Sequence, residues 1–113
     1  MFERPQFKVI YSDEVIEFLN SLDDKAKEKI MFNINKSKYV IDNEIFKKLK
    51  GSDIWEFRIK YNGSIYRVFA FWDTENGTLV VTTHGIIKKT QKTPSKEIKR
   101  AEAIRTEYFN SKK

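Results

Sequence analysis

The apolar positions in the first third of the chain predict one short strand and two helices. Residues 7–11 fit a short strand with Phe7, Val9 and Tyr11 on one face. Ser12 then suits a helix N-cap, and apolar residues follow it at helical spacing. A second helix begins at Asp23-Asp24, and its inner stripe comprises Ala26, Ile30 and Ile34. Because so few residues link the two helices, we expect an antiparallel helical hairpin.

In the middle of the chain the apolar period changes from helical to two. The apolar residues of segment 45–49 fit one helical turn, which Gly51 would end. Residues 55–61 then alternate large apolar side chains with charged ones, which predicts a strand with one buried and one charged face. Asn62-Gly63 is a strong hairpin signal, and a segment of high β propensity follows it.

The last third predicts another strand and a closing helix. A turn at 73–77 leads to a strand at 78–87, and Thr93-Pro94 fits an N-cap followed by the first helical residue. The inward positions of this helix are Ile98, Ala101, Ile104 and Tyr108. The order β-α-α-β-β-β-α therefore predicts one α+β domain over residues 1–113. We expect an antiparallel meander, the first strand in the same sheet, and helices on one face.

Composition and charge narrow the class of protein. The chain has no cysteine, which excludes disulfides and Cys-based zinc sites and agrees with a cytoplasmic location. It has no apolar run near the roughly 20 residues of a membrane span, and it does not begin like a signal peptide. The net charge is +6, and residues 47–100 carry twelve basic and five acidic side chains. This asymmetry indicates a surface for a polyanion such as nucleic acid, although a solvated basic face explains the charge equally well.

A pair of arginines is the first candidate site. A two-residue loop at Asn62-Gly63 places Arg58 directly opposite Arg67, with Glu56 diagonal to Arg67 on the same face. Like charges directly opposite each other destabilise a sheet. The pair is therefore expected where an anion binds between the two guanidiniums and Glu56 holds one of them. The alternative is that both guanidiniums point into solvent.

His84, the only histidine, is the second candidate, near the expected end of the third meander strand. An unshifted imidazole titrates near neutral pH, which suits proton transfer. The lysines that follow would surround it with positive charge; they are Lys88, Lys89 and Lys92. By themselves these lysines indicate phosphate contacts or a solvated loop, and a lone histidine is more often structural than catalytic.

The sequence has no histidine pair, no dense carboxylate cluster and no P-loop, so we expect no metal and no other cofactor. The remaining groups suit a phosphodiester. Cations can stabilise charge on the phosphate, and a histidine can move a proton. RNA supplies its own nucleophile, the 2′-OH.

Three motifs resemble the RelE/ParE superfamily of bacterial toxins, and most closely its HigB-like, phage-derived branch. They are WEFRI at 55–59, YRVF at 66–69 and HGIIKKTQKTP at 84–94, with a closing helix after them. The resemblance covers nearly the whole chain and implies a RelE-like fold. It also implies the toxin of a type II toxin–antitoxin system that enters the ribosomal A site and cuts mRNA without a metal. The implied partners are mRNA, the ribosome and an antitoxin, usually a helix-turn-helix protein of the HigA kind.

The resemblance also implies roles for individual residues. Arg67 would stabilise the transition state, and Arg58 and Lys60 would hold the scissile phosphate. His84 would be a general acid or base. The cations facing RNA would be Lys50, Lys88, Lys89 and Lys92. The start of the closing helix lacks the tyrosine of RelE, and lysines stand where HigB-like enzymes often have a second histidine, so His84 would carry more of the proton transfer.

Two other functions fit the same sequence. A ParE-like protein would inhibit DNA gyrase without cutting RNA, and it would need no proton-transfer group beside a basic loop. A degenerate toxin would only bind its antitoxin or RNA, which the missing tyrosine and second histidine would allow. We expect an antitoxin to dock on the helical hairpin and on the edge of the meander.

Overall fold

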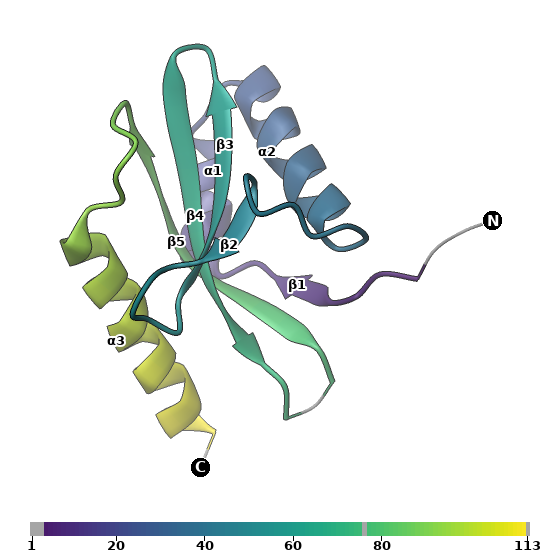
Figure 1. The fold of residues 1–113 in the computed structure, drawn as a ribbon, viewed down its shortest axis with the longest axis vertical. Helices are drawn as coiled ribbons and strands as arrows, with labels where there is room; N and C mark the ends of the chain where they lie inside the picture. Colours follow the sequence, from purple (N-terminus) through teal and green to yellow (C-terminus); the bar gives the residue numbers. More distant parts are fainter. Residues whose placement is uncertain (1–3, 76, 113) are drawn as a thin grey trace.

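The computed structural model describes residues 4–75 and 77–112, in which three helices pack on a five-stranded sheet (Figure 1). In chain order the elements are β1 (Lys8–Ile10), α1 (Asp13–Asn20), α2 (Asp24–Ser37), β2 (Phe46–Lys48), β3 (Trp55–Tyr61), β4 (Ser64–Asp73), β5 (Leu79–Lys88) and α3 (Ser95–Ser111). The strand order across the sheet is β1-β5-β4-β3-β2. Strand β1 runs parallel to β5, and the other neighbours are antiparallel. The α+β class and the meander of β3, β4 and β5 are confirmed.

The first two helices begin where their capping residues predicted. The Ser12 hydroxyl accepts a hydrogen bond from the Val15 amide at 3.1 Å, and the Asp23 carboxylate accepts one from the Ala26 amide at 2.9 Å. Each cap satisfies an amide that the first helical turn leaves without a backbone partner. The predicted inner stripe of α2 is fully buried at Ala26, Ile30 and Ile34.

The single helical turn expected at 45–49 is wrong, because Phe46–Lys48 forms strand β2 and pairs with β3. Phe46 stacks on Phe57 with 4.2 Å between ring centroids, so cross-strand packing favours the extended form.

The expected N-cap of the last helix is also wrong. Helix α3 begins at Ser95 after Pro94, without a side-chain cap, and the Thr93 hydroxyl donates to Glu56 instead. The turn expected at 73–77 contains residue 76, which lies outside the described residues.

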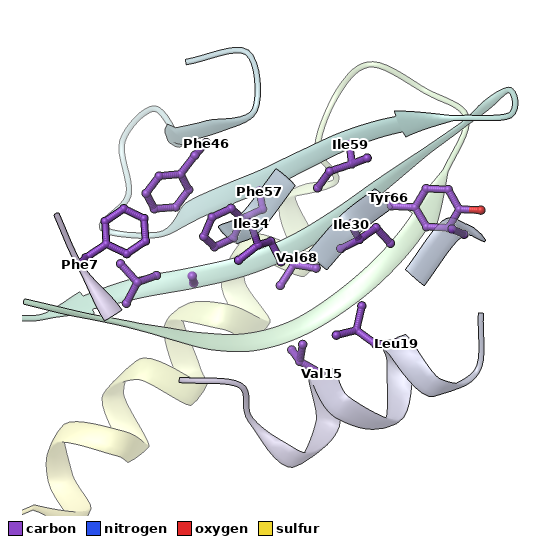
Figure 2. Close-up of a cluster of buried hydrophobic side chains, with 13 residues drawn as sticks. Phe7, Val15, Leu19, Ile30, Ile34, Phe46, Phe57, Ile59, Tyr66 and Val68 are labelled. Carbon is purple, nitrogen blue, oxygen red and sulfur yellow. The ribbon is translucent and has the colours of Figure 1, made fainter. Parts of the chain in front are cut away.

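Helices cover both faces of the sheet, so the expectation of one covered face is also wrong (Figure 1). Helices α1 and α2 pack on the face that carries Val68 and Ala70, and the buried cluster there includes Phe46 and Phe57 (Figure 2). Helix α3 packs through Ala101 on the face that carries Phe69 and Phe71. The alternation of side chains along β4 therefore serves two cores. Arg67 lies on the same face as Phe69, and the candidate site is consequently on the α3 side.

Candidate functional site

The Asn62-Gly63 turn places the two arginines as the sequence predicted. Asn62 and Gly63 have φ values of 51° and 81°, the left-handed conformation that a two-residue hairpin turn requires. The β3–β4 register pairs Arg58 with Arg67 and Lys60 with Ile65. Glu56 lies diagonally from Arg67, and its Oε2 is 3.3 Å from Arg67 Nε. The predicted pairing and the predicted Glu56 contact are therefore confirmed.

Arg67 is completely buried, so the alternative that both guanidiniums point into solvent is wrong. Its Nη2 donates to the backbone carbonyls of Thr90 and Gln91 at 2.9 and 2.6 Å. Burial lowers the pKa of Arg67 most strongly and the Arg58 charge lowers it further, whereas Glu56 raises it. Arg67 Nη1 has no hydrogen-bond partner among the described residues. A buried guanidinium with an unsatisfied donor has unused capacity to bind an anion.

Segment 89–93 covers the arginine pair and is bound to all three charged residues beneath it. Its backbone carbonyls accept from Arg67, the Gln91 side chain accepts from Arg58, and the Thr93 hydroxyl donates to Glu56 Oε2 at 2.6 Å. The position between the arginines, where we expected an anion, is therefore bordered by peptide oxygens of the same chain. An oxyanion at Arg67 would compete with these carbonyls.

A β-bulge determines which face His84 occupies. Val68 pairs with Gly85 and Ala70 pairs with Thr82, so Thr83 and His84 together lie opposite Phe69. One extra residue reverses the alternation of side chains beyond it. As a result His84 stacks on Phe69 with 4.8 Å between ring centroids, on the α3 side of the sheet. His84 lies within β5, four residues before the strand ends at Lys88, and it shares the α3 side of the sheet with Arg67.

The imidazole of His84 is fully buried and bonded at both nitrogens. Nε2 lies 3.1 Å from Glu97 Oε1, and Nδ1 lies 3.0 Å from the Thr83 hydroxyl. Burial lowers the pKa of His84 most strongly and Arg100 lowers it further, while Glu97 and Glu14 raise it. A neutral ring has a single N–H, and a carboxylate only accepts, so Nε2–H donates to Glu97 and Nδ1 accepts from Thr83.

The expected lysines do not surround His84. Lys88 ends β5, about 13 Å farther along the strand at the usual rise per residue. Lys88, Lys89 and Lys92 are exposed, and so is Lys60. Lys50 lies elsewhere, in the connection between β2 and β3, where Ser52 bonds to Glu102 and Asp53 pairs with Arg105. The structure therefore gathers Arg58, Lys60 and Arg67 near segment 89–93, the basic segment, which carries Lys89 and Lys92. Lys50 lies outside this group.

Glu97 and Thr93 are parts of the site that sequence reasoning missed. Glu97 fits the first turn of a helix, and Thr93 fits an N-cap, so neither position indicated a contact with the sheet. Both contacts depend on how α3 docks, which the local pattern does not encode. Tyr108, one of the predicted inward positions of α3, donates from its hydroxyl to Asp73 Oδ2 at 2.7 Å.

The described residues hold no group of three or more His, Cys, Asp or Glu side chains that could bind a metal ion. Nor is any helix in this part of the chain long and apolar enough to cross a membrane.

A comparison with protein families matches residues 17–106 to the phage-derived, Gp49-like proteins. The chain belongs to this family. The fold of this Gp49-like protein is that of RelE: it aligns with E. coli toxin RelE, a double arginine-to-alanine variant in the free state, with a TM-score of 0.61 and 16% identity over 88% of this chain and 97% of RelE. A second alignment is to the intact E. coli RelBE toxin–antitoxin complex, with a TM-score of 0.50 and 17% identity over 75% of this chain and 98% of the matched chain. No curated protein sequence matches the chain. The predicted phage-derived branch and the predicted RelE-like fold are confirmed.

Proposed function

We propose that this Gp49-like protein is the toxin of a type II toxin–antitoxin system and that it inhibits translation by cutting mRNA in the ribosomal A site without a metal. The observation that carries the proposal is the Arg58–Arg67 pair on a RelE fold. Two guanidiniums directly opposite each other repel, so their retention beside a basic segment supports an anionic substrate.

In the proposed reaction the 2′-OH of one nucleotide attacks the adjacent phosphorus. The O2′–P bond forms, the P–O5′ bond breaks, and the products are a 2′,3′-cyclic phosphate and a free 5′-hydroxyl. The 2′-OH loses a proton and the leaving O5′ gains one. Arg58 and Lys60 hold the phosphate, Arg67 stabilises its increased negative charge, and His84 transfers a proton. Lys88, Lys89 and Lys92 contact neighbouring phosphates of RNA, and Lys50 makes a more distant contact.

This mechanism requires a displacement of segment 89–97. Arg67 is covered by the backbone of Thr90 and Gln91, and His84 is held by Glu97 at the start of α3. Arg58 has a partly exposed side chain, and Lys60 is exposed. These two residues can therefore bind RNA first. An RNA phosphate that replaces the two carbonyls at Arg67 then favours the displaced segment, because an anion bonds a guanidinium more strongly than neutral oxygens do.

The test is a translation extract programmed with one defined mRNA, with 5′ ends mapped by primer extension. Wild type is compared with Arg58→Gln/Lys60→Gln and with Lys25→Gln/Lys99→Gln, which removes two charges at exposed lysines away from the arginine pair. We expect wild type and this control to cut equally and the Arg58→Gln/Lys60→Gln variant to cut at least about 100-fold more slowly. His84→Gln, tested beside them, should also be slow, and cleavage at the wild-type rate would assign proton transfer to another group. No cleavage by folded wild type would refute the nuclease.

A cognate antitoxin of the helix-turn-helix, HigA-like kind is the proposed protein partner, and the proposed location is the cytoplasm, where the ribosomes are. Support comes from the outer face of α2, where the side chains of Met31 and Phe32 are 39% and 67% exposed. Met31 and Phe32 line one surface cleft together with Tyr11, and apolar side chains that are exposed side by side mark an interaction surface. The meander edges support docking less, because β1 pairs with Leu79–Val81 of β5 and β2 pairs with Trp55–Phe57 of β3.

Binding without cleavage is the second candidate function, and the burial of Arg67 and His84 favours it. A protein of this kind would stop growth by binding RNA or a protein target such as DNA gyrase. Growth arrest by His84→Gln and Arg67→Met variants that still fold, without new mRNA 5′ ends, would support binding over cleavage. The order in which translation and DNA replication stop after induction separates the two kinds of target.

A further inference from the structure

A second basic site adjoins Arg58 of the arginine pair, at the edge of the sheet beside α2. Strand β2 pairs only with residues Trp55–Phe57, so the later residues of β3 form a sheet edge. Between this edge and α2 is a cleft of about 450 Å³. Its polar lining includes Lys29 and Asn33 of α2, Glu44 and Lys47 of the β2 region, and Arg58 and Lys60 of β3.

The cleft carries uncompensated positive charge. Four of these residues are cationic and only Glu44 is acidic. Within the described parts of the chain, none of the four cations takes part in an ion pair. Cations gathered without counter-charges in a concave site raise the local concentration of anions.

Lys29 connects this cleft with the basic segment. Its ammonium lies over the Tyr61 ring, 5.4 Å from the centroid, which holds it above β3. Lys29 and Lys60 also line an adjoining cleft of about 350 Å³ at the hairpin, together with Lys89 and Gln91. Because Gln91 also bonds to Arg58, a continuous basic strip runs from Lys47 past the candidate site to Lys89.

We propose that the α2–β3 cleft binds a second RNA phosphate, adjacent to the one held by Arg58, through Lys29 and Lys47. The inference rests on the proposed function, since it extends the RNA site of that function by one position. The amides of Asn33 and Asn43, which also line the cleft, can bond to a ribose or a base edge. An acidic protein segment fits less well, because protein interfaces are poor in lysine and the only apolar residues lining this cleft are Ile45 and Ile59.

The experiment measures equilibrium binding to 70S ribosomes programmed with an mRNA that carries a 2′-O-methyl group at each A-site nucleotide and so cannot be cut. The same mRNA without ribosomes is a parallel probe. The variant is Lys29→Gln/Lys47→Gln, and its matched control is Lys25→Gln/Lys99→Gln, which removes two exposed lysines outside the cleft. Circular dichroism melting verifies that all forms are folded.

We expect the cleft variant to bind programmed ribosomes at least about fivefold more weakly, and the control to match wild type. The slope of log K against log[salt] should become shallower by about 0.7 for the lost contact with a single strand. A loss on both probes supports the adjacent mRNA phosphate. A loss on ribosomes alone would assign the cleft to ribosomal RNA and overturn the adjacent position.

If the cleft variant binds as tightly as the control and wild type cuts mRNA, the proposed phosphate site in the cleft is refuted. The proposed nuclease function is then unaffected. Wild type that neither binds programmed ribosomes nor cuts mRNA overturns both. Unchanged ribosome binding with lost affinity for an antitoxin would assign the cleft to a protein and overturn the RNA site.

Discussion

The carboxylate of Glu56 and the guanidinium of Arg67 meet inside the protein, with 3.3 Å between Oε2 and Nε and almost no exposed surface on either side chain. Among the residues that the structure describes, Glu56 supplies the only negative charge in contact with this guanidinium, which is also next to Arg58. The pair lets the protein keep a buried cation beside a second cation. Loss of the carboxylate would leave Arg67 with only neutral oxygens as partners.

Glu56→Gln should therefore destabilise the fold strongly. Removing one member of a buried ion pair costs about 3–5 kcal/mol, because the remaining charge stays desolvated. The measurement is the free energy of unfolding from urea titrations followed by circular dichroism. The double variant Glu56→Gln/Arg67→Met should lose less than the sum of the two single losses. Additive losses would show that the two side chains do not interact.

The register of this pair could be predicted from the sequence, but its surroundings could not. Asn62-Gly63 fixes the hairpin through local backbone geometry, so the Arg58–Arg67 pairing follows from the chain itself. The covering of Arg67 depends on Thr90 and Gln91, more than twenty residues away, and on how α3 docks. His84 shares the face of Arg67 because of the bulge at Thr83, which has no local signal; alternation from Val80 alone would put the ring on the other face. Strand β2 was missed because three residues are too few to distinguish a strand from a helical turn.

The single histidine should titrate below its ordinary pKa. Burial and Arg100 both disfavour the imidazolium, whereas Glu97 and Glu14 favour it to a smaller extent. NMR can follow the His84 ring without assignment problems, since the chain has no other histidine. We expect a midpoint below about 6.5 in the folded protein and near 6.5 in urea. Glu97→Gln should lower the folded midpoint further, and a midpoint above 6.5 would contradict the buried neutral ring.

The same shift predicts how stability depends on pH. Because the folded pKa is lowered, the unfolded chain binds more protons once the pH falls below about 6.5. His84 should therefore reduce stability as the pH falls through this window and have no effect on it above the window. Urea midpoints of wild type and His84→Gln, measured between pH 7.5 and 5, should converge as the pH falls. Parallel curves for the two proteins would exclude His84 as the source of this pH dependence.

Asp73 should make the docking of α3 sensitive to acid. Its carboxylate accepts from Lys112 Nζ and the Tyr108 hydroxyl, each at 2.7 Å, and from the Glu75 amide. The hydrogen bonds from Lys112 and Tyr108 lower the pKa of Asp73 to about 2. The stabilisation is therefore complete above the unfolded pKa, near 4, and disappears as the pH falls towards 2.

Asp73→Asn should be less stable than wild type at pH 7, and the difference should shrink between about pH 4 and 2. Urea unfolding at several pH values measures this difference. Tyr108→Phe is the control, because it removes one donor and keeps the ion pair with Lys112. A difference between wild type and Asp73→Asn that stays constant down to pH 2 would show that the ionised carboxylate does not hold α3.

Thr93 should hold segment 89–93 closed over the arginine pair. Its hydroxyl donates to Glu56 at 2.6 Å, whereas the hydroxyl of Thr90 in the same segment reaches only the Lys92 carbonyl at 3.5 Å. Thr93→Val removes a hydrogen bond to a charged group and leaves the side-chain shape nearly unchanged. We expect a loss of about 1.5–3 kcal/mol in the free energy of unfolding and faster amide exchange in the segment. Thr90→Val, the matched control, should resemble wild type in both measurements. Equal exchange in the two variants would mean that the backbone bonds to Arg67, and not Thr93, keep the segment closed.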